Sequence, residues 1–277
     1  MALRVKTKAS LASVTDTVAG PTAQLPPRRV WRWLPASRRA ALDLLFPPRC
    51  TFCAAECLSR DGQPLFCPEC DDQFAVSSRQ RCPRCGLICA ETDLPRGDCG
   101  YCRGQRLHFT AVRTLGSYQD ALRQAVLKIK HAAHEPLAVA LGQRMAACLL
   151  ARPLAEKPDL VAPVPMHWLK RLVRRTNTAE TLARAVATTL DLPLHSRLIR
   201  CRRLLARQAS LTPPQRKLNV RDAFRASPWT RLNGRRVLVV DDVMTTGATA
   251  QEVSRALREA GAAAVYVATV ARSTPDF

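Results

Sequence analysis

Short apolar runs alternate with amphipathic segments along the chain after residue 105. The aliphatic run at 237–240 predicts a parallel strand that is buried on both faces. The amphipathic segment that starts at Ala248 and stops at Gly261 predicts a helix directly after that strand. We expect further strands at 109–118, 159–166 and 264–271, helices at 120–130, 136–151 and 178–190, and an irregular segment at 200–221. Strands that alternate with helices predict an α/β fold with a doubly wound parallel sheet.

A repeat of cysteines stands before this pattern, between residues 50 and 102. Each unit contains a Cys-x2-Cys pair, thirteen further residues and a second Cys-x2-Cys pair, and the unit recurs 32 positions later. Because two such pairs bring four thiolates to one tetrahedral ion, the spacing predicts two tandem zinc ribbons with closed, structural sites. The expected ligands are Cys50, Cys53, Cys67 and Cys70 for one zinc, and Cys82, Cys85, Cys99 and Cys102 for the other.

The cysteines leave other interpretations open. Each unit carries a fifth cysteine, Cys57 or Cys89, which lies outside the pairs and is left out of the ligand sets. A disulfide framework would need an oxidising compartment, and the start of the sequence lacks the features of a secretory signal. An iron–sulfur centre is the other alternative, although the paired knuckles match zinc better than a cluster-type run of cysteines.

The chain is strongly basic, with 43 Lys and Arg against 22 Asp and Glu and a formal charge of +21 at pH 7. Such a charge favours polyanionic partners, and a general solubility charge is the alternative. Residues 1–40 are basic and rich in Ser, Thr, Ala and Pro, which predicts a disordered extension; an organellar transit peptide has a similar composition. No run of 18 apolar residues occurs, so no transmembrane segment is expected.

Residues suited to binding a sugar phosphate follow the strand at 237–240. Asp241 and Asp242 come at its carboxyl end, where open α/β sheets bind ligands. Two adjacent carboxylates are costly unless they meet cations or hydroxyl donors, and a sugar diol, with or without Mg²⁺, meets that need. A hydroxyl-rich turn then leads into the helix, whose N-terminus attracts anions. The turn consists of Thr245, Thr246, Gly247, Ala248 and Thr249.

This segment resembles the phosphoribosyl-pyrophosphate loop of type I phosphoribosyltransferases. The resemblance implies that the paired acids hold the ribose hydroxyls and that the turn holds the 5′-phosphate. In a transferase, the Pro-Val-Pro turn and the basic residues after it would bind the pyrophosphate: Pro163, Val164, Pro165, Met166, Lys170 and Arg171. Arg207 and Arg216 are the candidates for mobile catalytic cations that close over the leaving group.

The order of these features resembles the ComF family of competence-associated proteins over residues 41–273. The matching pieces are 42–50, 163–165, Arg174, Asn177, Ala179, Gln208, Leu211, Arg216, Asn219, Val220, Ala223, Phe224 and 237–249. Arg175, Thr176 and Thr178 stand where the family has glycine, an aromatic residue and glutamine. We therefore divide the chain into a basic extension (1–40), a double zinc ribbon (41–105) and a type I phosphoribosyltransferase-like domain (106–277).

Three functions stay open. The family resemblance implies handling of incoming single-stranded DNA during natural transformation, in the cytoplasm beside the uptake channel and its competence helicase. Such a protein would bind phosphoribosyl pyrophosphate or a similar phosphate ligand. The loop also fits an active phosphoribosyltransferase that displaces pyrophosphate at the ribose, although the sequence has no evident acceptor pocket. A scaffold that senses phosphoribosyl pyrophosphate is the third function.

Overall fold

One parallel β-sheet organises the fold. The computed structural model describes residues 47–57, 66–75, 80–89, 98–167, 169, 177–206, 211–228 and 230–273. Within this part of the chain, the parallel strands lie in the order β1 (Ala111–Ser117), β6 (Ala264–Arg272), β5 (Arg236–Met244) and β2 (Leu160–Pro163). The sheet that the sequence predicts is therefore confirmed, and β5 lies in its interior.

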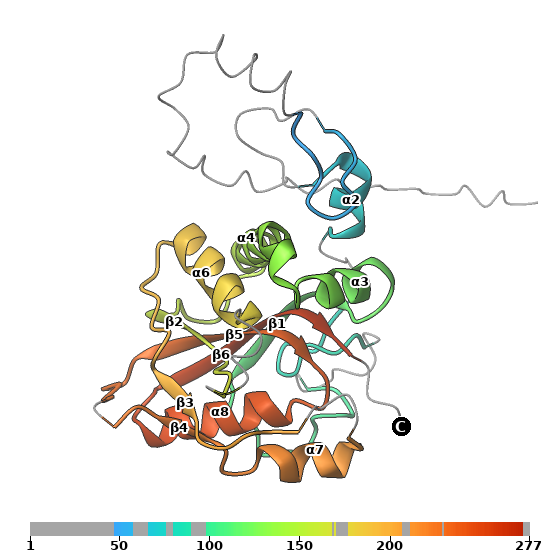
Figure 1. Cartoon of the computed structure of the whole chain (residues 1–277). Helices are drawn as coiled ribbons and strands as arrows, with labels where there is room; N and C mark the ends of the chain where they lie inside the picture. Colours follow the sequence, from blue (N-terminus) through green and yellow to red (C-terminus); the bar gives the residue numbers. More distant parts are fainter. Residues whose placement is uncertain are drawn as a thin grey trace, which may run out of the picture.

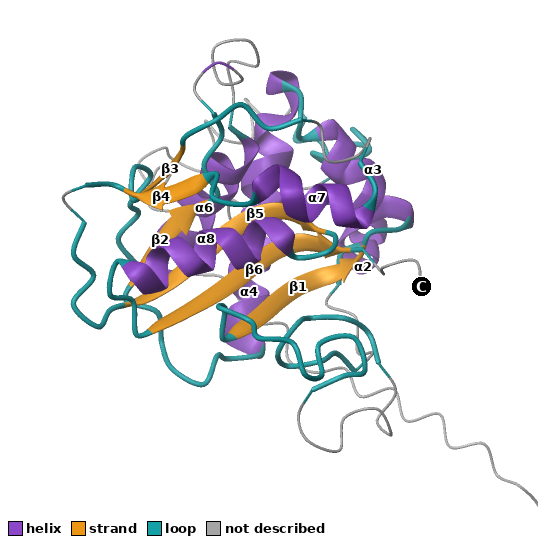
Figure 2. Ribbon diagram, turned by 90° about the horizontal axis from the view of Figure 1, so that it is seen from below, coloured by secondary structure: helices purple, strands orange, loops and turns teal. Residues whose placement is uncertain are grey.

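Helices cover both faces of the sheet, as Figures 1 and 2 show. One face carries α3 (Asp120–Lys128), α4 (Glu135–Ala151) and α6 (Thr178–Leu190); the other carries α7 (Pro213–Val220) and α8 (Ala248–Glu259). A short 3₁₀ helix, η3 (Ala132–His134), joins α3 to α4. Because both faces are covered, β6 is buried along all nine of its residues, as its unbroken apolar character requires. The layers are those of a doubly wound α/β sheet.

The segment at 200–221 is only partly irregular: the prediction holds at 202–206 and 211–212 and is wrong at 200–201 and 213–220. It holds the end of β3 (Ile199–Cys201), which pairs with β4 (Phe224–Ala226) in a separate antiparallel hairpin, and the whole of α7. A capping box starts α7, in which the Thr212 N–H donates to Gln215 Oε1 at 2.9 Å. Prolines at the first helical positions are compatible with this start, because no intrahelical bond is lost there.

β5 also runs further than the aliphatic segment predicts. It continues to Met244, past the two aspartates, because β6 keeps pairing with it over that distance. Asp241 lies opposite Thr269, and Met244 lies opposite Arg272. The paired acids are therefore held in regular strand geometry rather than in a loop.

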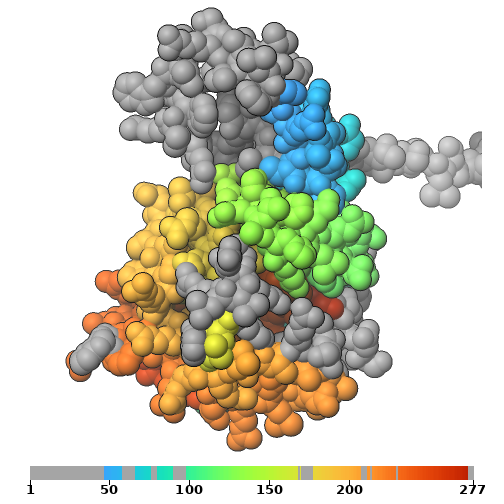
Figure 3. All heavy atoms as spheres, viewed as in Figure 1, coloured from blue at the N-terminus to red at the C-terminus, as the bar shows by residue number. Residues whose placement is uncertain are grey.

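The two cysteine-rich units lie at different places on this domain. The first, with α2 (Pro68–Gln73), rests on α3 and α4, as Figure 3 shows: Lys128 Nζ donates to the Phe52 carbonyl at 2.8 Å, and Arg144 pairs with Asp71. The loops of the second lie beside β1 (Figure 2), and Gln251 Nε2 of α8 donates to the Arg106 carbonyl, just after that unit, at 2.7 Å. The second unit is thus a neighbour of the turn before α8.

Candidate functional site: two cysteine tetrads and a phosphate-binding turn

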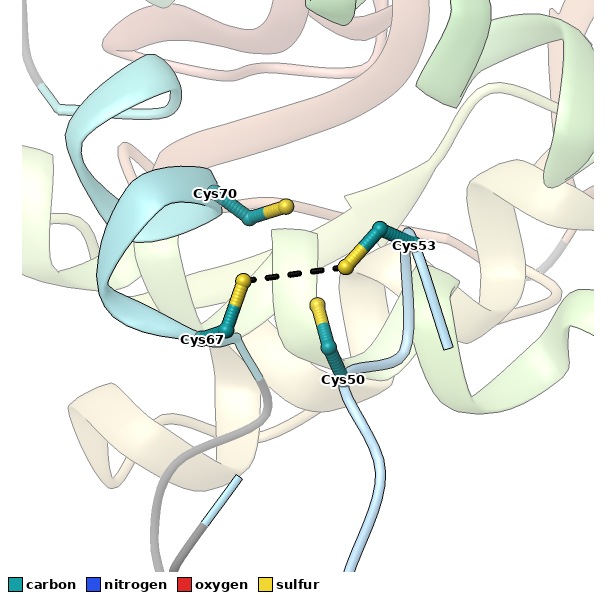
Figure 4. Close-up of side chains that lie close together, drawn as sticks. All are labelled: Cys50, Cys53, Cys67 and Cys70. Carbon is teal, nitrogen blue, oxygen red and sulfur yellow. Dashed lines mark hydrogen bonds between the residues drawn. The ribbon is translucent and has the colours of Figure 1, made fainter. Parts of the chain in front are cut away.

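The eight predicted zinc ligands gather in two tetrads. In each tetrad the four sulfur atoms lie within 4.8 Å of one another. Figure 4 shows the sulfurs of Cys50, Cys53, Cys67 and Cys70 pointing toward one another, with 3.6 Å between those of Cys53 and Cys67. In the second tetrad the sulfurs of Cys85 and Cys99 lie 3.4 Å apart. Zinc–sulfur bonds of about 2.3 Å in a tetrahedron place sulfurs about 3.8 Å apart, so both donor sets fit zinc.

The backbone explains why the fifth cysteine of each unit stays outside its tetrad. In the first unit the Ala54 N–H donates to the Cys50 carbonyl at 2.9 Å, and the Cys57 N–H closes a small hairpin onto Pro48. The second unit repeats the turn 32 residues later, with the Gly86 N–H donating to the Cys82 carbonyl at 2.9 Å. Cys57 therefore belongs to the hairpin stem rather than to the knuckle, and neither it nor its counterpart joins a tetrad.

The predicted phosphate turn lies at the carboxyl end of β5. Of its five predicted residues, Thr245, Thr246 and Gly247 form the turn, and Ala248 and Thr249 begin α8, whose N-cap residue Gly247 has a φ of 78°. Glycine suits this left-handed backbone because it has no Cβ to clash. Thr246 Oγ1 accepts a bond from the Ala248 N–H at 3.4 Å, so a hydroxyl already meets one N-terminal N–H of the helix. The remaining first-turn N–H groups form the kind of site that binds phosphate.

Asp241 and Asp242 are fixed by their neighbours. The Asp242 N–H donates to Asp241 Oδ1 at 2.9 Å, and the Val243 N–H donates to Asp242 Oδ1 at 2.8 Å. Lys130 follows the C-cap residue of α3, and its Nζ lies 4.0 Å from Asp242 Oδ2. Burial, and then the neighbouring Asp242 charge, raise the pKa of Asp241 well above its ordinary range. The pair therefore favours a bound proton, a cation or a hydroxyl donor.

A small cavity of about 30 Å³ joins part of the predicted site. Its lining includes these predicted residues: Asp241, Thr245, Gly247, Ala248, Thr249 and Val164. Asp242 and Thr246 belong to the same segment, but neither lines this cavity. The volume suits one or two water molecules, so a phosphoribosyl group has to widen the space or lie at its mouth.

Of the predicted pyrophosphate-binding and catalytic residues, only Val164 is among the described residues that line the cavity. Pro163, Pro165 and Met166 adjoin Val164, but they do not line the cavity. Arg216 lies on α7, on the sheet face that also carries α8, and is half-buried. Three of the predicted residues lie outside the described part of the chain, together with residues 1–40: Lys170, Arg171 and Arg207.

Two residues that the sequence reasoning missed join this site. Lys130 supplies a cation beside Asp242. The buried Thr269 of β6 lines the cavity, and in the described residues its hydroxyl has no hydrogen-bond partner. Neither residue belongs to the Asp-Asp-Thr-Thr-Gly segment, so only strand pairing and the packing of α3 reveal them.

Comparison with known proteins agrees with this architecture. A double zinc ribbon domain matches residues 41–104, and a phosphoribosyl transferase domain matches residues 176–274. The chain thus combines a double zinc ribbon with a phosphoribosyltransferase-type α/β domain. It is 31% identical over 196 residues to the DNA utilization protein YhgH of Escherichia coli K12. The aligned residues cover 69% of this chain and 84% of that protein. The chain belongs to the ComF family.

Two further matches are more distant. Competence protein F of Haemophilus influenzae is 25% identical over 230 residues, or 81% of this chain and 97% of that protein. A solved glutamine phosphoribosylpyrophosphate amidotransferase from B. subtilis is 22% identical over 52% of this chain and 30% of its own, with a TM-score of 0.35.

In the described residues, every helix is too short or too polar to cross a bilayer.

Proposed function

We propose that this protein binds phosphoribosyl pyrophosphate, or a similar phosphate ligand, at the turn before α8 and assists the handling of single-stranded DNA in natural transformation. The convergence of Asp241, Thr245 and Thr249 on one cavity at the end of β5 carries the ligand part. The DNA part is supported by relatives named for DNA utilization and competence. We propose that this activity takes place in the cytoplasm, beside a competence helicase. We also propose three parts of the chain: a basic extension (1–40), a double zinc ribbon (41–105) and a phosphoribosyltransferase-like domain (106–277).

In this proposal the ligand is held from several sides. Asp241 and Asp242 accept hydrogen bonds from the ribose hydroxyls, with Mg²⁺ where the diphosphate is present. The turn from Thr245 to Thr249 binds the 5′-phosphate through hydroxyls and helix N–H groups. The segment 163–166 and the basic residues Lys170 and Arg171 bind the diphosphate. Arg207 and Arg216 close over it, because mobile cations can neutralise its charge.

The β3–β4 hairpin supports the DNA part of the proposal. Arg200 and Arg225 lie directly opposite each other in this antiparallel pair, and both side chains are exposed. Like charges at opposite positions destabilise a hairpin, and a phosphodiester between them would remove that cost. Lys217 of α7 adds a further exposed cation in the neighbouring segment. Single-stranded DNA that binds here should bind mainly through its phosphates, with a steep salt dependence.

The hairpin is tested by a double variant, Arg200→Gln with Arg225→Gln. Its affinity for an oligothymidylate is measured by fluorescence anisotropy over a series of salt concentrations. Each phosphate contact contributes about 0.7 to the slope of log affinity against log salt, so losing two should lower the slope by about 1.4. The matched control, Arg123→Gln with Arg184→Gln, removes the same charge from exposed residues of α3 and α6. Equal slopes in both double variants would refute the hairpin as a DNA contact.

The phosphoribosyl transferase domain match favours a second candidate function, an active transferase. Such an enzyme would consume phosphoribosyl pyrophosphate in the presence of an acceptor and release pyrophosphate. Asp241→Ala with Asp242→Ala should abolish that consumption while leaving part of the DNA binding intact. If the ligand binds without turnover with any nucleobase or amine acceptor, a ligand-sensing scaffold is the better description of the domain.

A further inference from the structure

The second cysteine tetrad is hydrogen-bonded to the phosphate turn through Tyr101. This residue lies between Cys99 and Cys102, and its hydroxyl donates to the carbonyl oxygen of Thr246 at 3.0 Å. Thr246 is the middle residue of the turn, 145 positions further along the chain. A side chain of the metal-binding knuckle therefore holds the backbone on which phosphate binding depends.

The Tyr101 bond fixes the orientation of the peptide between Thr246 and Gly247. In a trans peptide the C=O and the following N–H point in opposite directions. Because the Thr246 carbonyl accepts the Tyr101 bond, the Gly247 N–H points away from Tyr101, and Gly247 itself lines the cavity. Glycine tolerates φ values of either sign, so a flip of this peptide costs little and would present a carbonyl oxygen to the phosphate. The Tyr101 bond opposes that flip.

Arg272 strengthens the same connection. This residue is 2% exposed and ends β6, and its Cζ lies 5.7 Å from the centre of the Tyr101 ring. Nε donates to the Cys85 carbonyl at 3.2 Å, and Nη1 donates to the Met244 carbonyl at 3.0 Å. One buried side chain thus joins the first knuckle of the tetrad to the last residue of β5. Four thiolates around Zn²⁺ carry a net charge of −2, which would balance this buried cation.

The first tetrad has different neighbours and provides an internal comparison. Its contacts run to α3 and α4, through Lys128 and Arg144. Both of those helices lie on the sheet face opposite α8. Loss of metal from the first tetrad should therefore leave the turn in place, whereas loss from the second should release Tyr101 and Arg272 together.

We propose that Tyr101 and Arg272 are positioning residues that make phosphate binding at the turn depend on metal in the second tetrad and not in the first. This inference rests on the proposed binding of phosphoribosyl pyrophosphate. It also has a required converse, because coupling between two sites is reciprocal: the ligand must tighten metal binding at the second tetrad by the same factor.

The first experiment compares Tyr101→Phe with Tyr266→Phe in the zinc-loaded protein. Tyr266 serves as the control, because it is a buried tyrosine that lies near the start of β6, whereas Arg272 lies at the end of that strand. Loss of one hydrogen bond should weaken binding of phosphoribosyl pyrophosphate by about 3- to 10-fold in Tyr101→Phe and leave it unchanged in Tyr266→Phe. Equal affinities in wild type and Tyr101→Phe would overturn the coupling.

The second experiment tests whether the ligand tightens metal binding at the second tetrad. A tyrosine that only stabilises the fold would not change this effect of the ligand. Zinc is withdrawn by a chelator titration at equilibrium, and the cysteines that become reactive to alkylation are mapped by peptide mass spectrometry. Phosphoribosyl pyrophosphate should protect Cys82, Cys85, Cys99 and Cys102 by about 3- to 10-fold and leave the first tetrad unchanged, and Tyr101→Phe should reduce the protection. Equal protection of both tetrads overturns the inference. If wild-type protein does not bind phosphoribosyl pyrophosphate, both the proposed function and this inference fail. The ligand titration of the first experiment separates that outcome from a loss of coupling alone.

Discussion

Replacement of Gly247 by alanine tests whether the geometry of the turn controls ligand binding. Gly247 has a φ of 78°, and an added Cβ would lie 2.6 Å from Met244 Cε. An L-residue in left-handed backbone costs about 1–2 kcal/mol. The contact with Met244 adds less, because that atom is the end of a flexible side chain. Gly247→Ala should therefore lower the free energy of unfolding by up to about 1–2 kcal/mol, and by less where the turn relaxes in the free protein.

Gly234 supplies a matched control, since it has the same φ of 78° and no atom within 4 Å of an added Cβ. Gly234→Ala should lose about 1–2 kcal/mol of stability in urea denaturation, at least as much as Gly247→Ala, yet bind phosphoribosyl pyrophosphate as the wild type does. In Gly247→Ala the free turn can relax, and the ligand must then restore the strained backbone. Binding should weaken by about 5- to 30-fold, the equivalent of 1–2 kcal/mol. If calorimetry gives the same affinity for both variants, the turn does not contact the ligand in this conformation.

Three further predictions concern metal content and pH. Cys67→Ser should lower the zinc content, measured by elemental mass spectrometry, by one ion per chain, whereas Cys57→Ser, outside the tetrad, should keep the wild-type content. Burial raises the pKa of Asp241 from 3.8, so the unfolded state loses its proton first and wild-type stability falls as pH rises above about 4. In urea denaturation, Asp241→Asn should therefore gain stability relative to wild type between about pH 3 and pH 7. A pH-independent difference between the two proteins would contradict this. Hydrogen bonds from Arg236 lower the pKa of Asp159 to about 2, so its stabilising contribution should be present above about pH 4 and disappear toward pH 2. Asp159→Asn should remove this acid dependence, but the effect is under about 1 kcal/mol because the pair is one third exposed.

The sequence predicts the parts of this protein whose signals are local. The buried strands and the helices that follow them show in apolar periodicity, and Cys-x2-Cys spacing places eight thiols in two tetrads. The wrong prediction falls on α7, where arginines and prolines hide a helix that a capping box from Thr212 to Gln215 starts. The capping residues were visible in the sequence, and they carry more weight than the charge of the segment.

The remainder of the site depends on contacts between distant parts of the chain. Lys130 reaches Asp242 because α3 packs at the carboxyl edge of the sheet, and Thr269 enters the cavity because β6 pairs with β5 past Asp241. Tyr101 meets Thr246 because the second ribbon packs beside α8. No spacing within one segment encodes these contacts, so the motif predicts the ligand class while the fold supplies the groups that orient it.

The proposed function requires that the Asp-Asp pair and the turn bind a phosphoribosyl group. Its most direct test is a calorimetric titration of the zinc-loaded protein with phosphoribosyl pyrophosphate, with and without Mg²⁺, beside Asp241→Asn with Asp242→Asn. We predict saturable binding that ribose 5-phosphate competes for and that weakens at least about tenfold in the double variant. Binding of inorganic phosphate as tight as that of phosphoribosyl pyrophosphate, and unchanged by loss of the two carboxylates, would contradict it.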